Sequence, residues 1–205
     1  MKTLPETILE RSRLVPEGGM LAAKEFLHLG SRAAVDQALS RLARAGLLIR
    51  AARGLYVAPT SGLGQVKVPA MDKVVSSLAS KTQELIVGDG AFAAHMLGLA
   101  PRPQNEQMFL TSGPNRTLRL GDAKVEIRHA PRWMLSLGHT KAGAVIRALA
   151  WGGERRVKGM MIRLRKRLAP GDWQALSSAR YLLPSWMAEV IGHEVARQAC
   201  SSAEF

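Results

Sequence analysis

The chain has 205 residues, of which 47% are hydrophobic, and its size allows one large domain or two small ones with a buried core. Its only cysteine, Cys200, excludes an internal disulfide and a thiolate metal cluster, which fits a reducing cytoplasm. The formal net charge of +13 at pH 7, from 29 Lys and Arg against 16 Asp and Glu, predicts a polyanionic partner, with nucleic acid ahead of an anionic membrane or an acidic protein.

Charged residues occur throughout the first turns of the chain, among them Lys2, Glu6, Glu10 and Arg11. They leave no room for the apolar core of a signal peptide. No run approaches the roughly 20 apolar residues that a membrane span requires. We therefore expect a cytoplasmic protein with no membrane span.

The first 30 residues predict two helices. Thr3 is a suitable cap and Pro5 suits the first turn of a helix that extends to Val15. The segment 21–28 predicts a second, short helix, and Leu29-Gly30 predicts the tight turn after it.

A third helix is predicted to begin after Ser31, whose hydroxyl suits an N-cap. Val35, Leu39 and Leu42 fall at the spacing that places them on one stripe facing a core. Gly46 supplies the positive φ with which helices commonly end.

Two short strands follow, Leu47–Arg50 and Leu55–Ala58, joined by the basic turn Ala51–Gly54. Helix, helix, turn, helix and hairpin in this order predict a winged helix-turn-helix over residues 1–60. The alternative is an amphipathic helix with a solvated basic face that leads into a hairpin.

A winged helix binds duplex DNA by placing the third helix in the major groove and the hairpin against phosphates or the minor groove. Gln37 suits adenine, Arg32 suits guanine and Ser40 suits either base, while the other arginines suit phosphates. The predicted DNA-binding residues are Ser31, Arg32, Ala33, Asp36, Gln37, Ser40, Arg41, Arg44, Arg50 and Arg53.

The rest of the chain predicts a linker over residues 61–69, rich in glycine and small polar residues, and an α+β domain over residues 70–205. This domain is expected to hold a small sheet and then a helical block. Helices are predicted at 71–81 and 91–97, strands at 84–87, 107–111, 117–120 and 124–129, and further helices at 139–151, 156–168, 172–182 and 184–198. The four tryptophans all lie in this half and are expected to pack its core.

Residues 154–167 contain seven cations and one acid, and Arg156, Arg163 and Arg167 share one face at helical spacing. They predict either a solvated helix face or a second polyanion surface, for DNA that flanks the operator or for RNA. The candidates for this surface are Arg116, Arg119, Arg128, Arg132, Arg155, Arg156, Lys158, Arg163 and Arg167.

Asp89 with Glu126-Ile127-Arg128 distantly resembles the carboxylates of metal-dependent nucleases. An arginine stands where such sites have a lysine, and its pKa is too high for base chemistry. The five histidines show no ligand spacing. We therefore expect no catalytic residue, metal or cofactor, and no enzyme.

Several segments resemble the AbiEi-type antitoxins of bacterial type IV toxin-antitoxin systems, particularly their compact DUF6088-like group. They are SRAAVDQALSRLARAGLLIRAARGLYVAP, VGDGAFAAHMLGL, FLTSGPNRTLRLGDAKVEIRHAPR and, more loosely, AGAVIRALAWGG and LLPSWMAEVI. The chain departs from the group at Gly88-Asp89-Gly90, where a Pro-Ser-Gly-like turn is expected.

The resemblance implies a transcriptional autorepressor whose winged helix binds repeats in its own promoter. It also implies a C-terminal domain that counters a nucleotidyltransferase-type toxin in phage defence, in many cases without a stable complex. The alternative is an RNA- or DNA-directed enzyme of nuclease type, or another nucleic-acid-binding factor, in which the winged helix only positions the rest.

Overall fold

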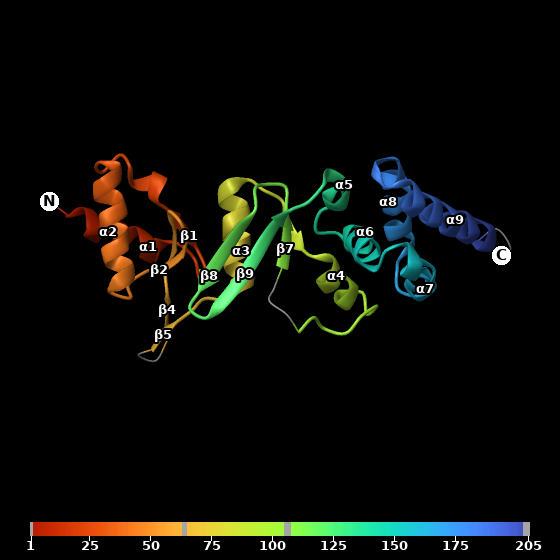
Figure 1. The fold of residues 1–205 in the computed structure, drawn as a ribbon, viewed down its shortest axis with the longest axis horizontal. Coiled ribbons are helices and arrows are strands. Elements are labelled where there is room, and N and C mark those ends of the chain that lie inside the picture. The colour runs from red at the N-terminus through yellow and green to blue at the C-terminus, as the bar shows by residue number, and fades with distance from the viewer. Residues whose placement is uncertain (1, 63–64, 105–107, 203–205) are drawn as a thin grey trace. The chain divides into compact units, whose positions relative to one another are not determined.

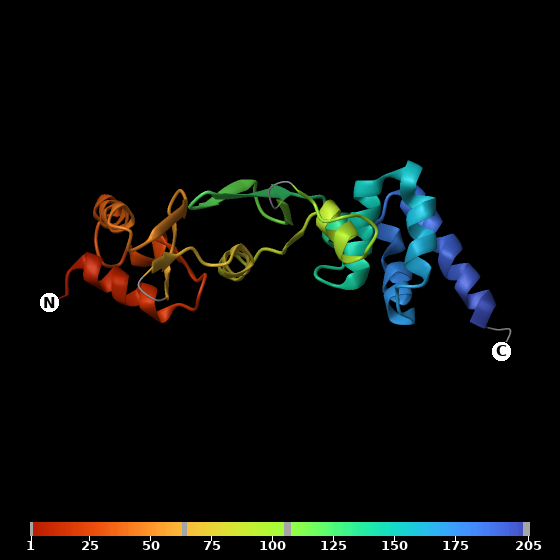
Figure 2. The ribbon, with the colours of Figure 1, turned by 90° about the horizontal axis from the view of Figure 1, so that it is seen from below.

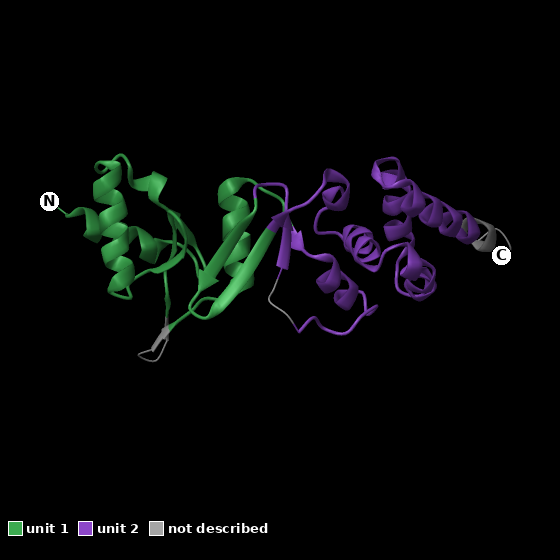
Figure 3. Cartoon of the chain, in the orientation of Figure 1, with its two compact units in different colours: residues 1–86, 115–127 green, residues 87–114, 128–205 purple. Residues whose placement is uncertain are grey.

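The computed structural model describes residues 2–62, 65–104 and 108–202, which form the predicted mixed α+β fold (Figure 1). The chain divides into two compact units (Figure 3): unit 1 is Met1–Ile86 with Asn115–Ile127, and unit 2 is Val87–Pro114 with Arg128–Phe205. The sequence predicts domains at 1–60 and 70–205 with a linker at 61–69. These are segments expected to fold independently, and they stay a prediction.

Unit 1 begins with helix α1, strand β1, the 3-10 helix η1, helix α2 and the strands β2 and β3. The strands form an antiparallel sheet in the order β1-β3-β2, and Val57 lies opposite both Met20 and Ile49. A core of Ile8, Leu21 and other apolar residues joins these elements. Their bounds are α1 Leu4–Leu14, β1 Met20–Ala22, η1 Ala23–Phe26, α2 Arg32–Arg44, β2 Ile49–Ala52 and β3 Leu55–Val57.

The first predicted helix is confirmed as α1, with Thr3 at its N-cap. The backbone amide of Thr3 donates to Oε2 of Glu6 over 2.8 Å. This hydrogen bond, then the Thr3 side chain and then the charge of Lys2, lower the pKa of the Glu6 carboxyl. The Glu6 carboxylate therefore satisfies the backbone amide of Thr3 where the helix begins.

The predicted helix over residues 21–28 is wrong. Met20–Ala22 instead forms β1 and pairs with β3, and only Ala23–Phe26 forms a helical turn, of the 3-10 type. The carboxylate of Glu25 accepts from the backbone amide of Ala22 over 2.8 Å and so ends the strand. Pairing with a strand more than 30 residues away overrode the local helix preference.

The rest of unit 1 contains the hairpin β4 (Thr60–Gly62) and β5 (Gln65–Lys67) and helix α3 (Met71–Thr82). It also contains β8 (Arg116–Leu120), which pairs with β9 (Ala123–His129), and β9 as far as Ile127. Helix α3 contacts the beginning of the chain, since Ser77 Oγ accepts from the backbone amide of Met20 over 2.9 Å. Ion pairs of Lys73 with Glu17 and of Lys81 with Glu25 add to this contact. The segment predicted as a linker thus contains two paired strands, while its Leu63 and Gly64 lie outside the described residues.

The second half of the chain contains a group of packed helices, as both Figure 1 and Figure 2 show for α6, α7, α8 and α9. A buried core that includes Ile146, Leu149 and Leu164 joins them. Helix α5 was not expected from the sequence. Gln107, predicted to begin a strand, lies outside the described residues. The remaining bounds are β6 Ile86–Gly88, α4 Gly90–Met96, β7 Met108–Thr111, α5 Arg132–Leu135, α6 Lys141–Gly152, α7 Glu154–Arg165, α8 Pro170–Ala179, η2 Arg180–Leu182 and α9 Ser185–Ser202, and the strand order is β6-β7-β9-β8.

Helices α4 and α6 approach each other closely at Gly90. A Cβ atom added there would lie 2.5 Å from both the carbonyl oxygen of Arg147 and the Cβ of Trp151. Only glycine fits this crossing without displacing backbone. None of the described helices combines the length and the apolar character needed to cross a lipid bilayer.

We predict opposite effects for two Gly→Ala substitutions in helices of unit 2. Gly90→Ala should lower the free energy of unfolding by about 1–3 kcal/mol through overpacking. Gly159→Ala, where an added Cβ meets nothing within 4 Å, should raise it by up to about 1 kcal/mol through helix propensity. Denaturant unfolding measures both, and an unchanged stability of the Gly90 variant would contradict the close crossing.

Candidate nucleic-acid interface

Helix α2 is fixed by one buried stripe. Val35, Leu39 and Leu42 are at most 6% exposed and pack in the core of unit 1. The predicted cap is confirmed, since Ser31 Oγ accepts from the backbone amide of Ala34 over 3.2 Å. Gly46, with φ 71°, follows the end of the helix as expected. Because these features fix the rotation of α2 about its axis, they also decide which side chains face outward.

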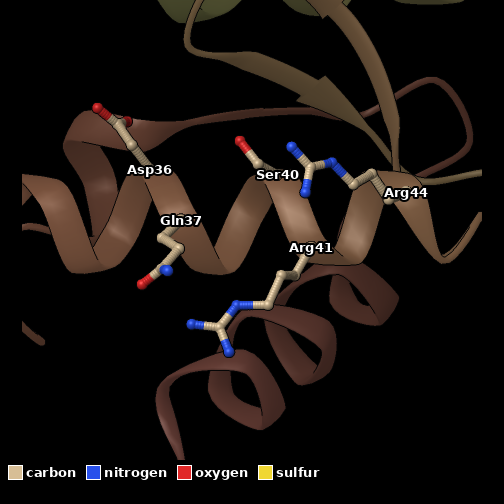
Figure 4. A pocket seen from close by; sticks show the side chains of 5 residues that line it. All are labelled: Asp36, Gln37, Ser40, Arg41 and Arg44. Carbon is tan, nitrogen blue, oxygen red and sulfur yellow. The ribbon is translucent and has the colours of Figure 1, made fainter.

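The face of α2 opposite the core is polar. Gln37 and Arg41 lie along one side of it, and Asp36, Ser40 and Arg44 lie along the other (Figure 4). These five side chains line an open concavity of about 510 Å³. Ser31, Arg32, Ala33, Gln37, Arg41 and Arg44 are exposed, and Asp36 and Ser40 are half-buried.

An ion pair joins two of the predicted DNA-binding residues. Arg32 Nε lies 2.9 Å from Asp36 Oδ2, one helical turn away, with 61% and 48% of the two side chains exposed. Such exposed pairs contribute on the order of 0–1 kcal/mol, so little free energy opposes their opening. Arg32 is therefore oriented by Asp36 and still available to a ligand.

The cations at the C-terminal end of α2 are available as well. Arg41 and Arg44 make no ion pair and no side-chain hydrogen bond within the described part of the chain. Their positive charges lie at the C-terminal, negative end of the helix dipole. This interaction stabilises the helix without a protein partner. Both guanidinium groups are thus free to bind phosphate oxygens.

The hairpin after α2 carries the two remaining predicted residues, Arg50 on β2 and Arg53 at the tip, and both are exposed. The strands differ from the prediction: β2 begins at Ile49 and continues through a register shift to Ala52, so the turn shortens to Arg53-Gly54. The carbonyl of Gly54 accepts from the backbone amide of Ala23 over 2.9 Å. The hairpin tip is therefore short and anchored to η1.

Structural partners hold at least Arg116, Arg163 and Arg167 of the predicted second surface. Arg116 Nη2 lies 2.7 Å from Glu84 Oε1, with 17% and 15% of the side chains exposed. Arg163 Nη1 donates to the carbonyl of Leu99 over 2.9 Å, and Arg167 Nη1 donates to that of Leu97 over 2.7 Å. The last two hydrogen bonds satisfy carbonyls just beyond the C-terminus of α4, where a cation is favoured.

The other six residues of that predicted surface are exposed. Arg119 belongs to unit 1, and the rest belong to unit 2. The guanidinium of Arg156 lies 5.1 Å from the ring centroid of Trp151. Trp151 is itself 42% exposed, so the expectation that it packs in the core is wrong, whereas Trp173 is buried as expected. The six are Arg119, Arg128, Arg132, Arg155, Arg156 and Lys158.

The two carboxylates considered for nuclease chemistry both have partners. Asp89 Oδ1 accepts from the backbone amide of Phe92 over 2.9 Å and caps α4. Glu126 Oε1 lies 3.1 Å from Lys124 Nζ. In the described ranges, no group of three or more His, Cys, Asp or Glu side chains is placed to hold a metal ion.

Sequence reasoning missed Arg147, which is 4% exposed in the core of unit 2. Its Nη1 donates to the carbonyl of Gly138 over 2.9 Å, while its buried Nε has no hydrogen-bond partner among the described residues. Burial lowers the pKa of its guanidinium. The sequence signal that could have revealed Arg147 is its place as the single cation in the apolar run AGAVIRALAW.

The comparisons with known proteins identify the family. The model of DUF6088, described as a family of unknown function, matches residues 7–169. The chain belongs to the DUF6088 family. No curated protein and no solved structure matches this DUF6088 chain. Membership in DUF6088 assigns no activity, and the link to AbiEi-type antitoxins stays a prediction.

We predict that the cap of α2 is required for its stability. Ser31→Ala removes the acceptor for the amide of Ala34 and should lower the free energy of unfolding by about 1 kcal/mol. Ser31→Asp keeps an acceptor and should retain the wild-type value. Equal stability of all three proteins in urea unfolding would show that the cap contributes nothing.

Proposed function

We propose that this DUF6088 chain is a sequence-specific DNA-binding protein whose helix α2 lies in the major groove. The observation that carries the proposal is the outward polar face of α2, along one side of which Gln37 and Arg41 lie (Figure 4). Arg32, Gln37 and Arg41 are all exposed. A helix fits the major groove, and Gln and Arg suit the bidentate hydrogen-bonding edges of adenine and guanine.

The element order supports a winged helix-turn-helix. Helix α1, β1, the short helix η1, α2 and the β2-β3 hairpin follow one another, with the strand order β1-β3-β2. In this interpretation α2 is the recognition helix and the hairpin is the wing. The short turn at Arg53 gives the wing one exposed guanidinium at its tip, which suits a single phosphate contact rather than a long insertion into the minor groove.

Asp36 gives the proposed interface a selective element. Its carboxylate repels phosphates, and it accepts from the amino group of cytosine. Asp36 holds Arg32 by an ion pair. When α2 enters the major groove, Arg32 therefore turns toward a base while Asp36 stays next to Arg32. Because an acidic residue here weakens attraction to phosphates, it favours sequence-specific contacts to base edges over non-specific binding to the DNA backbone.

We further propose that the protein represses its own operon as the antitoxin of a bacterial type IV toxin-antitoxin system. The support is the resemblance of the α2 and β7-β9 segments to AbiEi-type antitoxins. In this account it acts in the cytoplasm without catalysis or a cofactor, and it counters a nucleotidyltransferase-type toxin through its C-terminal half.

A gel-shift titration tests the repressor proposal. The promoter of the gene should bind more tightly than a random duplex of equal length, and binding should weaken steeply with salt. Equal affinity for the two duplexes would contradict sequence-specific recognition.

Gln37→Ala should relax the base preference. Loss of a bidentate contact should cost about 1–3 kcal/mol on the promoter and almost nothing on the random duplex. Ser76→Ala, an exposed change on α3, is the matched control and should bind like wild type. An unchanged ratio of promoter to random affinity in the Gln37 variant would remove Gln37 from the interface.

Arg53→Ala should weaken binding to every duplex alike. Loss of one phosphate contact should reduce the slope of log affinity against log salt by about 1. Arg53→Lys keeps the charge and should keep the slope. A change of sequence preference without a change of slope would contradict the assignment of the wing to phosphates.

Co-expression tests the antitoxin proposal separately. The wild-type chain should restore growth to cells that express the nucleotidyltransferase encoded beside its gene. A pull-down of the two proteins then distinguishes direct contact from antagonism without a complex. Continued growth arrest alongside intact promoter binding would leave a repressor that is not an antitoxin.

A further inference from the structure

A tryptophan and an arginine form an exposed pair at the joint between α6 and α7. Trp151 is 42% exposed, although large aromatic side chains are stabilised by burial. Arg156 packs over the indole ring at 5.1 Å from its centroid and has no carboxylate partner within the described residues. The pair therefore combines a flat apolar surface with hydrogen-bond donors that no acid occupies.

The joint that carries this pair is tightly built. Gly153, with φ 68°, both ends α6 and begins α7, so the two helices meet at one residue. The preceding Gly152 packs against the sulfur of Met160, where a Cβ atom would not fit. Trp151 is thus held on well-packed helices rather than on a loop, which favours a preformed site.

A row of cations begins beside this pair and continues along α7. Arg155, Lys158 and Lys166 are exposed and make no ion pair or side-chain hydrogen bond in the described ranges. At a rise of about 1.5 Å per residue the row extends roughly 16 Å along the helix axis. Ile162, which is exposed, and Gly159 lie between these cations. A Cβ atom added to Gly159 would meet nothing within 4 Å, so the surface there is open.

Two other arginines of α7, and Arg167 just beyond its end, do not belong to this row. Arg163 and Arg167 donate to carbonyls at the end of α4, and Arg165 Nε lies 2.6 Å from Oε1 of the buried Glu194. Arg155, Lys158 and Lys166 therefore lie on the outward face, and the arginines with protein partners lie on its two flanks. Arg156 lies on one flank, over the ring of Trp151. We name Trp151, Arg155, Arg156, Lys158 and Lys166 the α7 platform.

We propose that the α7 platform binds single-stranded nucleic acid. An unpaired base stacks on Trp151 and Arg156, and the phosphates that follow lie along the cations of α7. A duplex does not offer this contact, because its bases are stacked on one another. An acidic protein segment would pair with the cations but leave the indole without a partner. The site lies in unit 2 and does not depend on α2.

Fluorescence anisotropy of the full chain with labelled oligouridylate and oligothymidylate of about 12 nucleotides tests this proposal. Trp151→Ala should weaken binding about tenfold through loss of stacking, and Trp151→Phe should restore most of it. Combining Arg155→Gln, Lys158→Gln and Lys166→Gln should reduce the salt slope by about 2. Tighter binding of oligouridylate would name RNA as the ligand, and tighter binding of oligothymidylate would name single-stranded DNA.

Matched controls separate the platform from general charge and from α2. Combining Arg11→Gln, Arg13→Gln and Arg102→Gln removes three exposed cations elsewhere and should leave the slope closer to wild type. Tyr181→Ala removes an aromatic side chain that is 83% exposed and should have no effect. Gln37→Ala should leave single-strand binding unchanged. Wild-type affinity of Trp151→Ala with intact folding, or equal losses in the two triple variants, would overturn the proposal.

Discussion

The proposed interface depends on the burial of one stripe of α2. Val35, Leu39 and Leu42 lie in the core of unit 1, and this packing sets the rotation of the helix about its axis. A rotation that exposed these residues would leave apolar surface in water and bury the guanidinium groups of the opposite face. The outward projection of Gln37 and Arg41 is thus a consequence of how the opposite side of α2 packs, rather than of charge interactions on the outward face.

The net charge of +13 is a poor measure of the surface available to a polyanion, because several of the cations have partners within the fold. On α7, Arg163 binds a carbonyl beyond α4 and Arg165 pairs with Glu194, and just after α7 Arg167 binds another carbonyl there. Arg163 and Arg167 add side-chain donors at the C-terminus of α4, which already ends in a glycine cap at Gly98. The cations without such contacts keep all their donors available to a ligand, and on α7 they form the outward row.

Local signals predicted α2 within a residue, because the cap Ser31, the apolar spacing and Gly46 all lie within the segment itself. They failed for residues 21–28, where pairing with β3 decides the structure and no nearby residue reveals it. In the candidate sites, too, features set by local sequence were predictable and features set by distant residues were not. Exposure of Arg32 and Gln37 followed from helix periodicity, whereas the role of Arg163 depends on α4, more than 60 residues away.

Photo-crosslinking from position 37 tests the central claim most directly. With a photoreactive amino acid in place of Gln37, illumination on promoter DNA should attach the protein to bases within the repeat that it protects. The same amino acid in place of Ser76, on the exposed side of α3, should give little product. Equal crosslinking from both positions, or none from position 37 in a complex that still binds, would contradict recognition of DNA by α2.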